Sequence, residues 1–137
     1  MSRKTVHHTF LNAAAADGAG TELNVSNIDE LFIYVGAPTS TLTVKVRGTL
    51  ETTAPSGANW ANAASVTNRH DGLQLQSVET TATVVAGDTG IALSGAAHAK
   101  MYRVNLAGLG LSFVNCVVSG HSGGSVTVTA MGVSHNR

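Results

Sequence analysis

Charged residues, aromatic residues and cysteine are all scarce in this chain. Only 12% of its 137 residues are charged, and eight Lys and Arg are balanced by eight Asp and Glu. A formal net charge of zero argues against a protein that binds nucleic acid or a membrane surface electrostatically. No run approaches the roughly 18 consecutive apolar residues that a membrane helix needs. We therefore expect neither nucleic acid nor a membrane among its partners.

The chain has one cysteine, Cys116, so it cannot form an internal disulfide. This residue lies in the apolar run 113–118, where we expect a buried and unreactive thiol. The basic residues 1–8 are not followed by an apolar segment of signal-peptide length, so we expect no secretory leader.

Thr and Val are abundant, and they recur in patterns of period two. The clearest is residues 41–48, where Leu42, Val44 and Val46 alternate with polar residues as a half-buried antiparallel strand requires. Residues 31–35 form an apolar run of strand length, separated from the next strand by a short turn that contains proline. This arrangement predicts a hairpin.

Further strand patterns follow along the chain, separated by Gly-rich turns. A slip in the alternation between Phe113 and Val114 predicts a bulge. A turn is expected over residues 119–124. The expected strands are residues 60–66, 73–78, 81–85, 91–93, 101–106, 109–118 and 125–133.

These patterns predict an all-β protein with a single domain. We expect an antiparallel, jelly-roll-like β-sandwich of about eight to ten short strands over residues 12–137. An immunoglobulin-like strand order fits the alternation equally well. Residues 1–11 are expected to form an N-terminal arm that a partner orders.

The six histidines are the natural candidates for a metal site or a catalytic base. His7 and His8 are adjacent and would face opposite sides of a strand, and the other four lack a second ligand at zinc spacing. Only symmetry around an oligomer axis could bring identical histidines together. His70 and Asp71 could pair as a hydrolase's base and orienting carboxylate, but the Asp71-Gly72 dipeptide already predicts a turn. We expect no catalytic residue, no metal and no cofactor.

One part of the sequence places an apolar strand (31–35), a strand ending in Gly-Thr-Leu (42–50) and a loop with a lone tryptophan (59–60) in succession. Another part, residues 102–109 followed by 123–130, is similar to a closing hairpin. In both respects the chain resembles small β-sandwich virion structural proteins of tailed bacteriophages. The resemblance covers roughly half of the chain and rests on motifs that encode strands and turns.

The resemblance implies a non-enzymatic virion protein, made in the host cytoplasm. It favours a capsid decoration (cement) protein that stabilises the head, with a neck, tail or fibre-base protein as the alternative. The implied partners are other copies of the chain, with a trimer favoured, and the major capsid protein or other virion proteins. Low charge and small side chains suit flat packing between copies. The candidate contact residues are Arg3, Lys4, His7, His8 and Trp60.

A carbohydrate- or receptor-binding β-sandwich is the second class that the sequence allows. Such modules need exposed aromatic residues, but only 4% of this chain is aromatic and most of those residues lie within strand patterns, where we expect them in the core. We expect Trp60 to cover an edge of the core. The carbohydrate hypothesis requires Trp60 or Tyr102 to be exposed.

Overall fold

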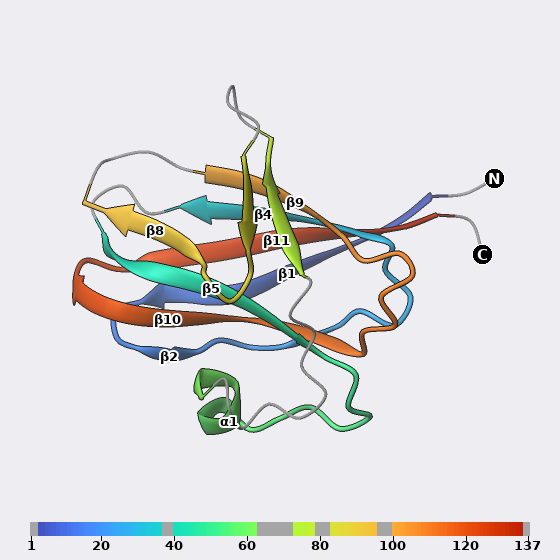
Figure 1. The fold of residues 1–137 in the computed structure, drawn as a ribbon, viewed down its shortest axis with the longest axis horizontal. Coiled ribbons are helices and arrows are strands. Elements are labelled where there is room, and N and C mark those ends of the chain that lie inside the picture. Colours follow the sequence, from blue (N-terminus) through green and yellow to red (C-terminus); the bar gives the residue numbers. More distant parts are fainter. Residues whose placement is uncertain (1–2, 37–39, 63–72, 79–82, 96–99, 136–137) are drawn as a thin grey trace.

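The computed structural model describes residues 3–36, 40–62, 73–78, 83–95 and 100–135. Within these residues the chain forms eleven β-strands and one short α-helix, arranged as two antiparallel sheets (Figure 1). The elements are β1 (Arg3–Ala14), β2 (Gly18–Ala19), β3 (Leu23–Asn24), β4 (Glu30–Gly36), β5 (Thr41–Thr49), α1 (Gly57–Ala61), β6 (Gln74–Ser77), β7 (Val84–Ala86), β8 (Ile91–Ser94), β9 (Lys100–Asn105), β10 (Phe113–Gly123) and β11 (Val126–His135).

The two sheets have six and five strands. The first sheet has the order β1-β11-β4-β9-β6-β7, and the second has the order β2-β10-β5-β8 with β3 also paired to β10. This architecture confirms the predicted all-β, antiparallel sandwich. It also supplies the strand order that alternation alone had left open.

The core lies between the sheets and is built from alternating residues of both. In β5 the inward residues are Leu42, Val44 and Val46, and in β4 they are every second residue from Leu31 to Val35; each is at most 2% exposed. Burying one such aliphatic side chain contributes about 1.5–3 kcal/mol. The alternation read from the sequence therefore identifies the core-facing residues of β5 correctly.

The two predicted hairpins are wrong, because in neither of them do the two strands pair with each other. β4 pairs with β11 and β9, whereas β5 pairs with β10 and β8. The strands of the predicted closing hairpin, β9 and β11, lie in the six-stranded sheet with β4 between them. Period-two alternation shows which residues of a strand face the core. It does not show which of the two sheets the strand joins. Residues 37–39, which include the predicted proline turn, lie outside the described part of the chain.

The segment expected to be an N-terminal arm belongs to the sheet instead. β1 pairs with β11 from Arg3 opposite His135 to Ala14 opposite Val126. Its second half is anchored by Phe10, which is 2% exposed. The first half of β1 and the last part of β11 extend side by side at one end of the molecule (Figure 1). Sequence reasoning missed this strand because Val6 is the one apolar residue from Arg3 to Thr9, so no alternation of apolar and polar residues is seen there.

Strand β10 is covered on both faces. Every second residue from Val114 faces the core, while Val117 packs on the outside against Trp60 of α1. The slip in alternation at residues 113–114 reflects this covered outer face. The predicted bulge there is wrong, because the pairing with β5 is regular at those residues and shifts only between residues 119 and 123. β10 thus continues through most of the predicted turn.

Helix α1 stands where a strand was predicted to begin. Its N-cap is Ser56, whose hydroxyl accepts a hydrogen bond from the backbone N of Asn59 at 3.2 Å. At its other end Arg47 of β5 donates from Nη1 to the carbonyl oxygens of Trp60 at 2.6 Å and Ala61 at 2.9 Å. A cation there satisfies carbonyls that the helix leaves without partners. Arg47 therefore holds α1 against the outer face of the second sheet.

We expect Arg47→Met to lower the free energy of unfolding by about 1–3 kcal/mol, because two helix-end carbonyls lose their donor while the apolar stem is kept. Asp88→Asn is the matched control, because Asp88 lies 3.3 Å from Arg47 Nε and is 48% exposed. That variant should change stability by less than about 0.5 kcal/mol. Urea unfolding followed by tryptophan fluorescence measures both. Equal losses in the two variants would show that the ion pair, not the carbonyl bonds, holds the helix.

The chain leaves β2 through Gly20, where two backbones approach closely. The Gly20 N–H donates to the carbonyl of Cys116 at 2.9 Å, and its carbonyl accepts from Asn115 Nδ2 at 2.9 Å. A Cβ atom at this position would lie 1.9 Å from the carbonyl oxygen of Phe10. The close approach of this segment to β1 and β10 therefore requires glycine.

Gly20→Ala should lower the free energy of unfolding by about 1–3 kcal/mol, because the backbone must shift to admit the methyl group. Gly123→Ala is the matched control, since a Cβ there meets nothing within 4 Å. Thermal unfolding monitored by circular dichroism compares the two. A Tm for Gly20→Ala that equals the control's would contradict the packing described here.

Candidate functional site

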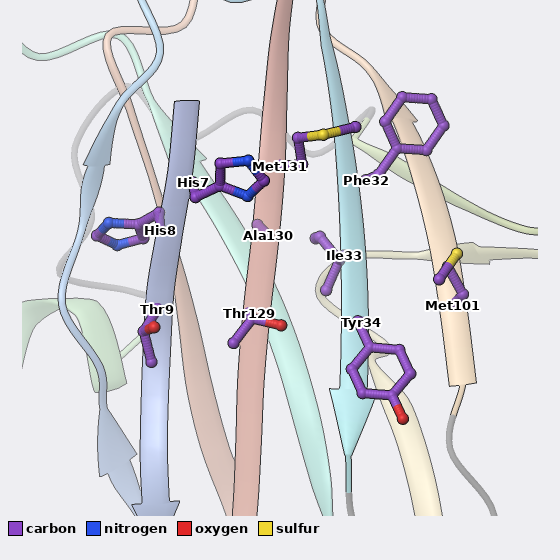
Figure 2. Close-up of a pocket in the computed structure, with 10 residues that line it drawn as sticks. All are labelled: His7, His8, Thr9, Phe32, Ile33, Tyr34, Met101, Thr129, Ala130 and Met131. Atoms are coloured by element: carbon purple, nitrogen blue, oxygen red, sulfur yellow. The ribbon is translucent and has the colours of Figure 1, made fainter. Parts of the chain in front are cut away.

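Four of the five predicted contact residues belong to β1. Arg3, Lys4, His7 and His8 follow one another along its first half. Lys4 and His7 are exposed, whereas His8 is half-buried with its Nε2 atom 2.7 Å from the carbonyl oxygen of Thr21. His7 and His8 point to opposite faces of the strand, as expected (Figure 2).

Trp60, the fifth predicted contact residue, lies on the other sheet. It is 1% exposed and packs against Val117, in accord with its expected role at the edge of the core. Its indole Nε1 has no hydrogen-bond partner among the described residues. Tyr102 is 6% exposed. Neither residue provides the exposed aromatic platform that the carbohydrate hypothesis required of them.

The other residues considered as metal ligands or catalytic groups are dispersed or lie outside the described residues. Within the described ranges, no group of three or more His, Cys, Asp or Glu is placed to hold a metal ion. Burial raises the pKa of the Cys116 thiol, which confirms the expected buried cysteine. His70, Asp71, His98 and residues 63–66 of the predicted strand all lie outside the described part of the chain.

In the described part of the chain, no helix has the length and hydropathy that a membrane span needs.

The outer face of the six-stranded sheet carries a groove across β1, β11, β4 and β9 (Figure 2). This outer-sheet groove has a volume of about 550 Å³. The strand register sets its outward-facing side chains in two parallel rows. The rows are His7–Met131–Phe32 and Thr9–Thr129–Tyr34–Met101.

Strand geometry gives the dimensions of the groove. The two rows are two residues apart along each strand, which separates them by about 6.7 Å, and the four strands span three gaps of about 4.8 Å. The two rows are therefore about 7 Å apart, measured between their backbones, and about 14 Å long. Ala130 and Ile33 lie between the rows, and both are buried. The floor is consequently the backbone of the sheet.

Large apolar side chains are exposed in this groove. Tyr34 is 44% exposed and Met101 is 40% exposed, and Phe32 and Met131 are partly exposed beside them. Clustered apolar residues on the surface of a small protein mark binding sites. Methionine side chains are also flexible and polarisable, which lets them adapt to a ligand.

The groove has no free charge. None of its lining residues is Lys, Arg, Asp or Glu. Arg103 extends the first row beyond Phe32, but its Nε donates to Glu30 Oε2 at 2.8 Å. His135 Nε2 lies 3.0 Å from Glu30 Oε1. The hydrogen bond from Arg103, followed by that from His135, lowers the pKa of Glu30, so this carboxylate neutralises the arginine at the end of the groove.

Sequence reasoning missed the outer-sheet groove. Phe32 and Tyr34 lie in the run 31–35, which is apolar at every position and therefore resembles a strand buried on both faces. In the structure only its alternate residues are buried, and Tyr34 faces outward. The assignment of Tyr34 to the core is thus wrong. One signal was available: Met101 and Met131 occupy polar-face positions of their own alternating strands.

Comparison with known proteins identifies the class of fold. No protein-family model matches the chain, and no curated protein matches it in sequence. Among solved structures, the SPBc2 prophage-derived protein YomS superposes with a TM-score of 0.70 and 18% identity, over 98% of this chain and 96% of YomS. The β-sandwich described here is therefore a fold that occurs in prophage-derived proteins.

A second solved structure shares the fold. The PBSX exported protein XepA superposes with a TM-score of 0.69 and 19% identity, over 98% of this chain and 39% of XepA. The chain thus corresponds to well under half the length of XepA. At these identities the two likenesses concern the fold.

Glu30→Gln should lower the free energy of unfolding by about 0.5–1 kcal/mol near neutral pH, because Arg103 and His135 lose a charged acceptor. The pKa of Glu30 is lowered in the folded protein. Its contribution is therefore fully present above the pKa of the unfolded state and is lost as the pH falls through the lower folded value. Urea unfolding at about pH 7 and about pH 2.5 measures the difference. A stability gap of the same size at both pH values would contradict this role.

Proposed function

We propose that this protein is a non-enzymatic structural component of a phage virion that decorates the capsid and stabilises the head by surface contacts. In this proposal it assembles as a homo-oligomer, a trimer, and binds the major capsid protein. A position in the neck, tail or fibre base is the alternative. The virion is its place of action, after synthesis in the host cytoplasm.

The observation that carries the proposal is the likeness to YomS over nearly the full length of both chains. YomS is a prophage-derived protein, so the likeness supports a phage origin for a chain whose sequence also resembles virion proteins. The balanced charge of the chain supports close packing against copies and partners, because it adds no net repulsion. Repetition around a symmetric shell would strengthen each modest contact.

The paired ends of β1 and β11 are the best candidate for the contact surface. β1 is an edge strand of the six-stranded sheet, and its residues from Lys4 to His7 are exposed on both faces. An edge strand presents backbone N–H and C=O groups that can pair with a strand of another protein. Val6, at 40% exposure, adds an apolar side chain to this edge.

The test mixes the purified protein with separated heads and tails of the phage that encodes it. We expect the protein to sediment with heads, and light scattering to give a solution mass of a multiple of 14.0 kDa. Sedimentation with tails alone would overturn the assignment to the head. A monomer that sediments with neither would overturn the structural role.

Two matched variants test the contact surface. Val6→Asp places a charge on β1, and Val84→Asp places one on β7, the opposite edge of the same sheet, where Val84 is 58% exposed. We expect Val6→Asp to weaken binding to heads by about tenfold or more and Val84→Asp to leave it unchanged. Unfolding curves establish that both variants fold. Equal binding by the two variants would exclude this end of β1 as the contact.

A further inference from the structure

The outer-sheet groove combines apolar surface with polar groups that have no hydrogen-bond partner among the described residues. Besides its aromatic rings and thioethers, it contains the hydroxyls of Thr9, Thr129 and Tyr34 and the imidazole of His7. None of these four side chains makes a hydrogen bond within the described part of the chain. A wholly apolar ligand would bury them unpaired, at a cost of about 1–3 kcal/mol each. The ligand must therefore bring hydrogen-bonding groups as well as apolar surface.

The charge of the groove narrows the class of ligand further. Its lining residues include no Lys, Arg, Asp or Glu, and the nearby Arg103 is neutralised by Glu30. An anionic or cationic ligand would lose its hydration without gaining a counter-charge. The groove is therefore suited to an uncharged molecule.

The shape of the groove argues against a two-fold contact between copies of this chain through this face. In a two-fold contact the same surface meets itself, so two grooves would face each other and enclose a void instead of filling it. The area between the two rows is also only about 100 Å², well below the roughly 800 Å² that each partner buries in a stable interface. A slender ligand that enters the groove fills it better.

We propose that the outer-sheet groove binds a short, neutral oligosaccharide. A sugar ring has an apolar C–H face and an edge of uncharged hydroxyls, which match the two kinds of group in the groove. The ring face would lie against Tyr34 and Phe32, with Met101 and Met131 filling the space at their sides. The hydroxyl edge would bond to the row that contains Thr9 and Thr129. This inference does not depend on the proposed role in the virion.

The groove's two aromatic rings both come from β4. Phe32 and Tyr34 are two residues apart, and both face outward because Leu31, Ile33 and Val35 face the core. They lie in different rows (Figure 2), so a ligand along the groove passes between them. The site is thus held by a rigid central strand, since β4 is hydrogen-bonded on both sides.

The test measures retention of the whole protein on immobilised cellotriose, maltotriose and triacetylchitotriose, with sialyllactose as an acidic comparison. We expect at least one neutral trisaccharide to retain the protein and sialyllactose not to exceed it. Calorimetric titration with the retained trisaccharide then gives a Kd. Retention by none of the three neutral sugars, or by sialyllactose alone, would overturn the proposal.

Three variants locate the site. Tyr34→Ala should weaken binding by about tenfold or more, and Thr129→Val, which removes only a hydroxyl at nearly constant shape, by about fivefold. Val84→Ser is the control, because Val84 lies on the same outer face but outside the groove. All are exposed or partly exposed positions, and urea unfolding confirms that each variant folds. Binding that Tyr34→Ala leaves intact would overturn the proposed site. A fall in the solution mass of Tyr34→Ala would assign the face to contacts between copies instead.

Discussion

The constraint on which this structure depends is that each β-sheet has two faces and the shared core can cover only one of them. The inward faces are matched, because alternating aliphatic residues of β4 and β5 meet across the sandwich. Each outward face must then be covered by another segment or be exposed to solvent. The two sheets differ in this respect: one outward face is covered by a helix, and the other exposes a groove.

The five-stranded sheet covers its outer face with its own chain. Helix α1 places Trp60 on Val117, and Arg47 reaches through to the carbonyls at the end of the helix. An arginine is well suited to this position because its guanidinium offers several donors in a fixed plane. The six-stranded sheet has no such cover over β4 in the described part of the chain. It leaves Phe32 and Tyr34 in the two rows that border the outer-sheet groove.

Much of the fold could be predicted from the sequence, because period-two alternation is a local signal. It located β5, β6 and β9 and identified Leu42, Val44 and Val46 as core residues. Pairing between strands is not local, so the division of β4 and β5 between sheets could not be read from the chain. The short helix was missed for a similar reason: its five residues depend on contacts from Arg47, ten residues before the helix begins.

The candidate site was less predictable than the fold. Its residues come from four strands that are far apart in sequence, and only the register brings His7, Met131 and Phe32 into one row. The prediction that Trp60 contacts a partner failed to foresee its burial, although its role at the edge of the core was anticipated. The lone tryptophan is thus part of the core's edge, while an ordinary apolar strand supplies the exposed aromatic side chain Tyr34.

The pairing of Arg3 with His135 also determines where the two ends of the domain leave it. Both strand ends lie at the same end of the sandwich (Figure 1). A polypeptide fused to either end would therefore emerge from the same end of the sandwich. A short linker could equally join the two strand ends, so that the chain could be opened at another loop to give a circularly permuted domain with the same sheets.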